Sequence, residues 1–188
     1  LAVATVSNAG LVSGVENGSA VISAYTASGG YIATSTVTVT GVPAEGQIDD
    51  AIEIAALKDL YNSTGGLTWT NKTNWPTTEQ EWQSIQFVSD IDFYGVGVTD
   101  GDVTELTFAV NGLNGSIPQS IQNLQKLEGV NFSYNHVVSV GTLNQISSLK
   151  YVYLRDAQLS TLPDFGACQG LLNLDMALNT AIPAAAFP

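Results

Sequence analysis

The chain of 188 residues contains one cysteine, one histidine and only five lysine or arginine residues. A single cysteine excludes an internal disulfide and a cysteine-based metal cluster, and a single histidine excludes a metal site with two histidine ligands. Seventeen acidic residues outnumber the basic ones and give a net charge of -12. This charge disfavours nucleic acids and anionic membranes as partners, because both are negative. The longest apolar runs are too short to span a membrane.

Few residues are therefore candidates for catalysis. His136 follows a predicted turn and is expected at the surface, while Cys168 is expected to fill space in a convex segment of the fold. Nucleophilic catalysis needs a nucleophile, a base and an orienting group in contact, and the sequence offers no such set. We expect no catalytic residue.

Acid pairs are the remaining candidates for a calcium site or a pair of glycosidase carboxylates. The pairs are Asp49 with Asp50, Asp90 with Asp92, and Asp100 with Asp102. We interpret the first as helix capping, the second as alternating strand residues that face water, and the third as part of a turn. Gly65-Gly66 lacks the Gly-Lys-Ser/Thr of a phosphate loop. The sequence thus predicts neither a metal nor a cofactor.

Residues 1–41 contain no lysine, arginine or aspartate, and Glu16 is the single acid. Strands are predicted at 3–6, 20–25 and 32–39, where valine alternates with threonine, and glycine-containing turns separate them. The stretches 3–12, 18–24 and 36–39 resemble the bacterial immunoglobulin-like domain of group 2. This resemblance implies the C-terminal part of an all-β sandwich, because a whole one needs about 100 residues. A free-standing hairpin extension is the alternative.

Residues 42–47 are predicted to be a linker, and a helix is predicted to follow it. Asp50 and Glu53 have the spacing of a capping box, and Gly65-Gly66 is expected to end the helix. The predicted apolar face consists of Ile48, Ile52, Ala55, Ala56 and Leu60. Trp69 and Trp75 then lie in a polar loop and require a core that covers them.

From Val103 onward the sequence repeats. Apolar residues recur at matching positions in segments that begin at Val103, Leu127, Leu149 and Leu171, which lie 24, 22 and 22 residues apart. These periods fall within the range of about 20 to 29 residues that is typical of leucine-rich repeats. A solenoid is expected, in which each repeat buries its apolar face against its neighbours.

The segment Leu113-Asn114-Gly115-Ser116-Ile117-Pro118, continuing to Leu124, resembles the plant-type leucine-rich repeat. Residues 56–62, with Gly65-Gly66, Trp69, Asn74 and Trp75, resemble the N-terminal cap of that family. The resemblance implies a helical cap over 48–102 and about four repeats over 103–188. The chain departs from the family by lacking the cap's cysteine pair and the Gly-x-Ile-Pro motif in later repeats.

Two sets of residues follow from this repeat alignment. Asparagines end the apolar strand in three repeats and are predicted to form a structural ladder by bonding unpaired backbone groups. They are Asn111, Asn135 and Asn179, with Ala157 breaking the ladder in the third repeat. Residues between the inward positions must face outward on a concave surface. The predicted ligand-binding residues there are Tyr151, Tyr153, Arg155, Asn131, Asn173 and Asp175.

Exposed tyrosine and arginine are enriched at binding hot spots, although tyrosines that pack across strands for sheet stability give the same pattern. We predict a non-enzymatic recognition or adhesion protein, extracellular or on a bacterial cell surface. Its ligand would be a protein, peptide or glycan, with host-derived molecules among the candidates. The combination of modules resembles surface proteins of gut-type bacteria.

Two alternatives remain. The chain is an accessory module of a larger secreted carbohydrate-active or proteolytic enzyme, or a purely structural surface array. Because the sequence starts without methionine or a signal peptide, we expect it to begin inside a longer protein. We also expect further repeats or a cap after Pro188, since solenoid ends require covering.

Overall fold

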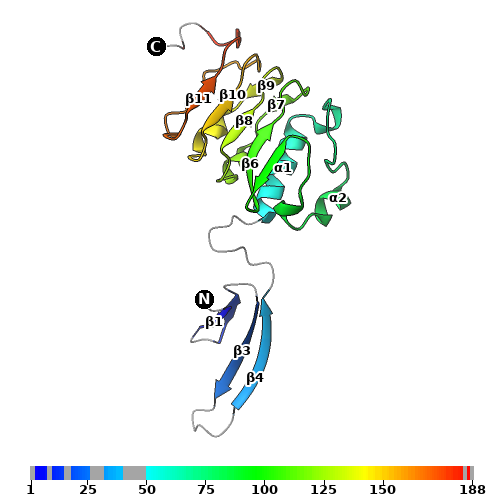
Figure 1. Ribbon diagram of the computed structural model, residues 1–188, viewed down its shortest axis with the longest axis vertical. Coiled ribbons are helices and arrows are strands. Elements are labelled where there is room, and N and C mark those ends of the chain that lie inside the picture. The colour runs from blue at the N-terminus through cyan, green and yellow to red at the C-terminus, as the bar shows by residue number, and fades with distance from the viewer. Residues whose placement is uncertain are drawn as a thin grey trace. The chain divides into compact units, whose positions relative to one another are not determined.

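A computed structural model describes residues 3–7, 10–14, 18–25, 32–39, 50–183 and 186. Contacts divide the chain into two compact units, Leu1–Gln47 and Ile48–Pro188, which we describe one at a time (Figure 1). The predicted linker 42–47 lies outside the described residues, as do Ile48 and Asp49 at the predicted start of the helix.

The first unit consists of two separate antiparallel strand pairs. Its strands are β1 (Ala4–Val6), β2 (Val12–Gly14), β3 (Gly18–Tyr25) and β4 (Ile32–Val39). β1 pairs with β2, and β3 pairs with β4 from Gly18 opposite Val39 to Tyr25 opposite Ile32. Three of these strands lie at the predicted places, whereas β2 was not predicted. No described side chain of this unit is buried, so the immunoglobulin-like sandwich stays a prediction.

The second unit carries all remaining elements. Its helices are α1 (Asp50–Ser63) and α2 (Glu79–Ser84), and its 3-10 turns are η1 (Gly66–Thr68), η2 (Val88–Asp90), η3 (Gln119–Asn123) and η4 (Gly141–Gln145). Its strands are β5 (Val96–Thr99), β6 (Asp102–Thr107), β7 (Asn114–Ser116), β8 (Gly129–Asn131), β9 (His136–Ser139), β10 (Tyr151–Tyr153) and β11 (Asn173–Asp175).

A five-stranded sheet runs through this unit in the order β11-β10-β8-β6-β5. β6, β8, β10 and β11 are parallel neighbours, and β5 pairs antiparallel with β6. The register aligns Glu105, Gly129, Tyr151 and Asn173 side by side. These residues are 24, 22 and 22 positions apart in the chain, as the sequence periods predict, so each repeat adds one strand to a solenoid (Figure 1).

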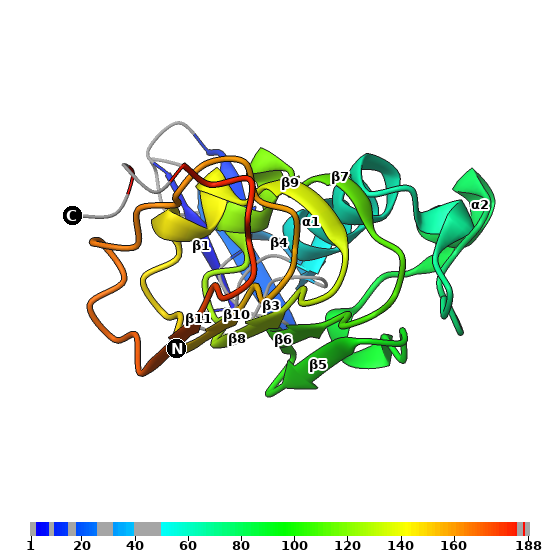
Figure 2. The same cartoon turned by 90° about the horizontal axis from the view of Figure 1, so that it is seen from above.

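The core lies between this sheet and a second layer. Figure 2 shows the five-stranded sheet on one side of the unit and α1, with the short parallel pair β7–β9, on the other. The inward residues of the first three repeats are almost fully buried: Val103, Leu106, Phe108, Leu127, Val130, Phe132, Leu149, Val152 and Leu154. In the fourth repeat, Leu174 occupies the position of Val130 and Val152 but is 39% exposed to solvent.

Helix α1 packs against η3 and β6 at the start of the repeats. It buries Ala56 and Leu60 as predicted, together with Ile54, Leu57 and Tyr61. The predicted apolar face is wrong at Ile52, which is 43% exposed, and at Ala55, which is also exposed. The face was mispredicted because Glu53, an ionisable residue, lies on the buried side of the helix. A polar residue at a core position interrupts the apolar periodicity from which the buried face is predicted.

The prediction of a capping box at Asp50 and Glu53 is also wrong. Asp50 is the first helical residue, and its carboxylate accepts a hydrogen bond from the Val88 N–H at 2.8 Å. The Glu53 carboxylate accepts one from the Val103 N–H at 3.0 Å. Both groups tie α1 to other segments instead of closing its first turn. The predicted stop is correct, because the helix ends at Ser63 and Gly65 is left-handed with φ 73°.

Aromatic side chains fill the region between α1 and the first repeat. Trp69 and Trp75 are 2% and 4% exposed, as a covering core requires. Tyr61 stacks on Trp75 with centroids 5.6 Å apart, and Trp69 meets Trp75 edge-on at 5.0 Å. The indole N–H groups of Trp69 and Trp75 donate to the carbonyls of Thr64 and Tyr94, respectively. The two indoles are therefore buried with their donors paired, whereas the buried Tyr61 hydroxyl has no hydrogen-bond partner among the described residues.

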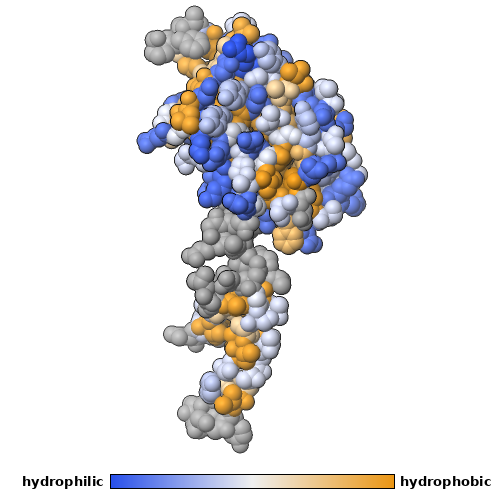
Figure 3. Space-filling view, viewed as in Figure 1, coloured by the Kyte–Doolittle hydropathy of each residue, from blue (hydrophilic) through white to orange (hydrophobic). Residues whose placement is uncertain are grey.

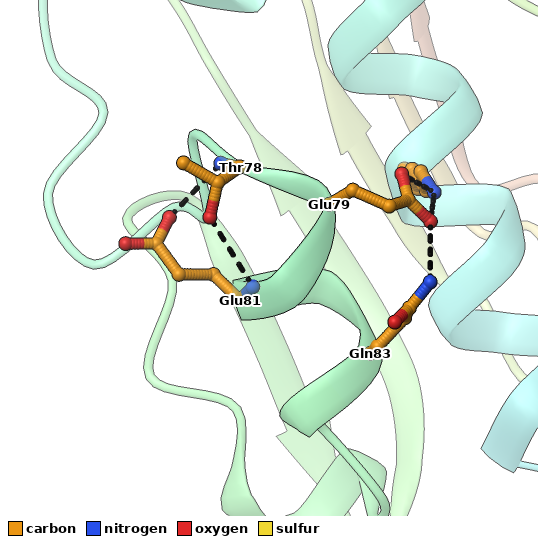
Figure 4. A network of polar contacts seen from close by, with 5 residues as sticks. Thr78, Glu79, Glu81 and Gln83 are labelled. Carbon is orange, nitrogen blue, oxygen red and sulfur yellow. Dashed lines mark hydrogen bonds and ion pairs between the residues drawn. The ribbon is translucent and has the colours of Figure 1, made fainter.

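A polar network fixes α2 beside α1 (Figure 4). Thr78 and Glu81 form a capping box, in which the Thr78 hydroxyl accepts from the Glu81 N–H and the Glu81 carboxylate accepts from the Thr78 N–H. Lys58 of α1 donates to both carboxylate oxygens of Glu79 of α2. The hydrogen bond from Lys58 lowers the pKa of Glu79 below its ordinary value. The two helices are thus linked by an ion pair at the surface.

Each coil of the solenoid has one non-glycine residue in the left-handed region at the same place. These residues are Val110, Tyr134, Asp156 and Leu178, with φ between 48° and 66°. Each directly precedes a ladder position. Left-handed backbone costs roughly 1 to 2 kcal/mol for an ordinary L-residue, and most for a β-branched one such as Val110.

We predict that Val110→Asn raises the free energy of unfolding by about 1 kcal/mol, because asparagine tolerates this backbone and the Val110 side chain, 68% exposed, gives up little packing. Urea unfolding followed by tryptophan fluorescence measures the effect, since all three tryptophans lie in this unit. Leu67→Asn is the control, with 67% exposure and no positive φ. Equal effects of both variants would contradict the assignment of strain to Val110.

Candidate functional site

The predicted ladder asparagines lie at the turns that follow the parallel strands. Asn135 is 7% exposed, and its side-chain oxygen accepts from the N–H groups of Asn111 and Leu113 in the preceding repeat, at 3.1 and 3.0 Å. Its amide nitrogen donates to the carbonyls of Phe108, Phe132 and Ser133. One side chain thus satisfies five backbone groups from two coils.

The other two asparagines make equivalent contacts. Asn179 accepts from the N–H groups of Ala157 and Leu159 and donates to the carbonyls of Leu154 and Met176. Asn111 has no complete repeat before it. Its side chain instead forms a pair of hydrogen bonds with the backbone N–H and carbonyl of Asn71. The ladder therefore continues into the segment that precedes the repeats.

Ala157 has no side chain with which to bridge to the second repeat. The backbone compensates there, because the Val137 N–H donates to the Ala157 carbonyl at 2.8 Å. Val137 occupies the same position as Leu113 and Leu159, whose N–H groups bind an asparagine oxygen. The interruption of the ladder thus leaves this donor paired.

The residues predicted to bind ligand lie on the side of the five-stranded sheet that is opposite the core. We call this surface the open sheet face; it corresponds to the predicted concave face. The strand register arranges it in rows across β6, β8, β10 and β11. The first row is Glu105, Gly129, Tyr151 and Asn173, and the second is Thr107, Asn131, Tyr153 and Asp175.

Exposure on this face alternates with the buried inward positions. Tyr151 is 41% exposed, and Tyr153 and Arg155 are partly exposed, while Val152 between the tyrosines is fully buried. Asn173 is exposed, and Asn131 is partly so. Among the described elements of the repeat unit, none lies over this side of the sheet. Figure 3 shows hydrophilic residues interspersed with hydrophobic ones over the visible face of the repeat unit.

Arg155 is already engaged by its neighbour. Its Nε donates to Asp175 Oδ2 at 2.9 Å, and the other oxygen of Asp175 accepts from the Ala177 N–H. The Ala177 hydrogen bond and, after it, Arg155 hold the pKa of Asp175 below its ordinary range. The predicted arginine donor is thus half of a neutral pair.

Sequence reasoning did not include Glu105 and Gly129 among the site residues. Glu105 is exposed, and Gly129 lies between it and Tyr151 in the first row. Strand parity points to both positions, and the register places them in line with Tyr151.

Glu53 was also missed as a functional candidate. Its side chain is fully buried, with Oε2 bonded to the Val103 N–H and Oε1 without a hydrogen-bond partner among the described residues. Burial raises the pKa of Glu53 from 4.5 to about 7, opposed by the Val103 hydrogen bond and assisted by the charges of Asp102 and Asp50. This carboxyl group therefore titrates near neutral pH.

Only some of the acid pairs are arranged as the sequence predicts. Asp90 and Asp92 do not alternate in a strand, because η2 ends at Asp90 and Asp92 follows in an irregular segment, where its carboxylate accepts from the Asn74 amide. Asp100 lies in the turn between β5 and β6, and Asp102 is buried at the start of β6. Among the described residues, no group of three or more histidine, cysteine, aspartate or glutamate side chains is placed to hold a metal ion.

Cys168 and His136 differ in their surroundings. Cys168 is 4% exposed, and its thiol lies 3.4 Å from the Ile146 carbonyl. Burial, with a smaller contribution from Asp164, raises the pKa of the Cys168 thiol, which disfavours the reactive thiolate. His136 is exposed, in strand β9 and not in a turn.

No helix in the described ranges has the length and apolar character to cross a membrane.

No family model and no curated protein sequence matches the chain. Solved structures similar to it include a leucine-rich repeat protein from Bacteroides eggerthii DSM 20697, with 22% identity, a TM-score of 0.35, and coverage of 45% of this chain and 14% of that one. Another is a leucine-rich repeat protein from Bacteroides thetaiotaomicron VPI-5482, with 22% identity, a TM-score of 0.34, and 66% and 18% coverage. The leucine-rich repeat ectodomain of the receptor kinase SOBIR1 from Arabidopsis thaliana has 19% identity, a TM-score of 0.37, and 66% and 78% coverage.

The chain spans less than a fifth of the length of the two bacterial proteins. Its own geometry, with parallel strands 22 to 24 residues apart and asparagine side chains bridging adjacent coils, defines the type of fold. The repeat unit is a solenoid that adds one parallel strand per repeat. The resemblances to the plant-type subclass and to bacterial immunoglobulin-like domains stay predictions.

We predict that Asn135→Ala lowers the free energy of unfolding by roughly 3 kcal/mol, because buried backbone donors and acceptors lose their partner. Urea unfolding of the full chain measures the loss through tryptophan fluorescence. Asn173→Ala, at an exposed position on β11, is the control and should change stability by less than about 0.5 kcal/mol. A parent-like Asn135→Ala variant would contradict the structural role of the ladder.

The buried carboxyl group of Glu53 should make the stability of the protein depend on pH. Because its pKa is raised on folding, the folded state binds more protons between about pH 4.5 and 7, and the free energy of unfolding falls as pH rises through this window. Glu53→Gln should be more stable than the parent at pH 8, by about 2 kcal/mol, and similar to it at pH 5.

Unfolding in urea at both pH values measures this difference. Glu105→Gln removes the same charge from an exposed side chain of β6 and is the control. If both variants shift the pH dependence equally, the effect comes from net charge and not from the buried carboxyl group.

Proposed function

We propose that the chain is a non-enzymatic recognition module that binds a protein, peptide or glycan ligand on the open sheet face. The observation that carries this proposal is the set of outward-facing residues along β10 and the turn after it. Tyr151 is exposed and Tyr153 and Arg155 are partly exposed, with Asn131, Asn173 and Asp175 on the neighbouring strands.

The chemistry of these side chains supports binding. Tyrosine offers a large amphipathic surface with few rotatable bonds, so little entropy is lost on contact. Asparagine and aspartate supply hydrogen-bonding groups that suit a peptide backbone or sugar hydroxyls. The buried positions on the other side of each strand keep this surface rigid, because their packing fixes the strands that present it.

A location outside the cell, with the strand pairs of residues 1–41 acting as part of an immunoglobulin-like spacer, belongs to the same proposal. Its support is the sequence resemblance and the absence of charged side chains other than Glu16 in that segment. The buried thiol with its raised pKa, Cys168, offers no nucleophile for catalysis.

A screen of the immobilised full chain against purified matrix proteins and a glycan array tests this function. For any ligand found, Tyr153→Ala should weaken binding at least fivefold, which corresponds to more than about 1 kcal/mol. The fold should remain intact, because the inward residues are unchanged. Tyr25→Ala, which removes an exposed tyrosine from β3 of the first unit, is the control and should leave affinity unchanged.

A ligand whose binding is lost in Tyr25→Ala but kept in Tyr153→Ala would overturn the proposal. A hydrogen-exchange footprint that maps wholly to the η3 and η4 side of the solenoid would do the same.

A further inference from the structure

One row of the open sheet face has a distinctive composition. Gly97 of β5, Glu105 of β6, Gly129 of β8 and Tyr151 of β10 lie side by side across four strands. Glu105 therefore has a glycine on each neighbouring strand, and its exposed side chain stands without side-chain neighbours in this row. Beyond Gly129, the ring of Tyr151 rises from the same side of the sheet.

Gly129 has no side chain between Glu105 and Tyr151, and a Cβ at this position would meet only Glu105 Cγ, at 3.7 Å; we call this gap in the row the notch. Adjacent strands are about 4.8 Å apart, so β6 and β10 are separated by roughly 10 Å. A cationic group above Gly129 would lie about 5 Å from each strand. From there a cation can approach the side chains of both strands: a tyrosine ring attracts a cation within roughly 6 Å of its centroid, and a carboxylate forms an ion pair with it.

The charges around the notch favour a cation. On this face Arg155 is paired with Asp175, and at the strand entries Lys150 is paired with Glu128 at 2.6 Å. Glu105 has no hydrogen bond or ion pair to any described residue. Among these charged groups, the carboxylate of Glu105 is therefore the one without an ion-pair partner. The unit as a whole is acidic, because it contains 15 of the 17 acidic residues and only five basic ones.

We propose that the notch formed by Glu105, Gly129 and Tyr151 binds a lysine or arginine side chain of an extended basic peptide segment. This inference rests on the proposed function, since it assigns the ligand class for the same face. The carboxylate neutralises the cation, the tyrosine ring covers its apolar stem, and the glycine provides the space. The net charge of -12 attracts such a segment from a distance, because opposite charges speed association.

Titration with short peptides tests the assignment. The probes are acetylated and amidated peptides of about ten residues, built from glycine and serine with three lysines, three glutamines or three glutamates. Binding to the full chain is followed by amide chemical shifts of Gly129 and Tyr151. The lysine peptide should shift these signals, and the glutamine and glutamate peptides should not.

Two variants locate the cation. Glu105→Gln removes the charge, and Gly129→Thr fills the notch with a residue that suits strands. A Cβ at Gly129 meets only Glu105 Cγ, at 3.7 Å, and the backbone there has no positive φ, so this substitution fits. Each variant should weaken lysine-peptide binding at least threefold. Asp59→Asn, an exposed acid on α1, is the control for net charge and should change affinity by less than 1.5-fold.

Each outcome decides between two conclusions. If Asp59→Asn weakens binding as much as Glu105→Gln, the attraction is diffuse and the notch assignment is wrong. If the glutamine peptide or a glycan shifts the same signals equally, or if no lysine peptide binds, the basic ligand class is wrong while the open sheet face can still be the binding surface. Loss of binding in Tyr153→Ala but not in Gly129→Thr would keep the proposed function and overturn this inference.

Discussion

The turn after each parallel strand imposes the constraint on which the solenoid depends. There the chain leaves the sheet through a residue in the left-handed region, from Val110 in the first repeat to Leu178 in the fourth. A turn of this kind points backbone N–H and carbonyl groups into the core, where an unpaired group costs roughly 1 to 3 kcal/mol. The asparagine that follows has one acceptor and two donors on a short side chain, and Asn135 uses them on backbone groups of its own coil and of the preceding one. The same bonds therefore close the turn and set the spacing of the strands.

The alternation of side chains along the strands separates the packed core from the open sheet face. Val152 and Leu154 face the core and are fully buried, whereas Tyr151 and Tyr153 face solvent from the same strand. Substitutions on the outer side leave the packed layer intact, so the open sheet face is free to vary in chemistry.

Glu53 is an exception to the apolar interior. Its carboxylate holds the first backbone N–H of the repeat region, at Val103, against helix α1, at the cost of placing an ionisable group where water cannot reach it.

Features that depend on local spacing were predictable from the sequence. The repeat periods fixed which residues pair across strands, because a parallel register copies the spacing of the repeats. The role of asparagine at the turn followed from its polar groups. Features that depend on distant partners were not predictable. Glu53 occupies the buried stripe of α1 because of Val103, 50 residues away, and this displaced the apolar face from Ile52 toward Ile54. The left-handed turns were not predictable either, because valine, tyrosine and leucine have no preference for that backbone conformation.

The charge of the open sheet face shows the same distinction between composition and arrangement. From the sequence, Arg155 is a cationic donor that follows two tyrosines among the predicted ligand-binding residues. In the structure, one strand spacing brings Arg155 to Asp175, and the two charges neutralise each other. The pair is only part-buried, so it adds little to stability, but it decides the sign of the surface. With that cation neutralised, the exposed carboxylate of Glu105 sets the electrostatic character of the face, and the aromatic side chain that faces it across Gly129 suits a positive partner. The proposed ligand preference of this face therefore depends on which charges remain unpaired after the strands align.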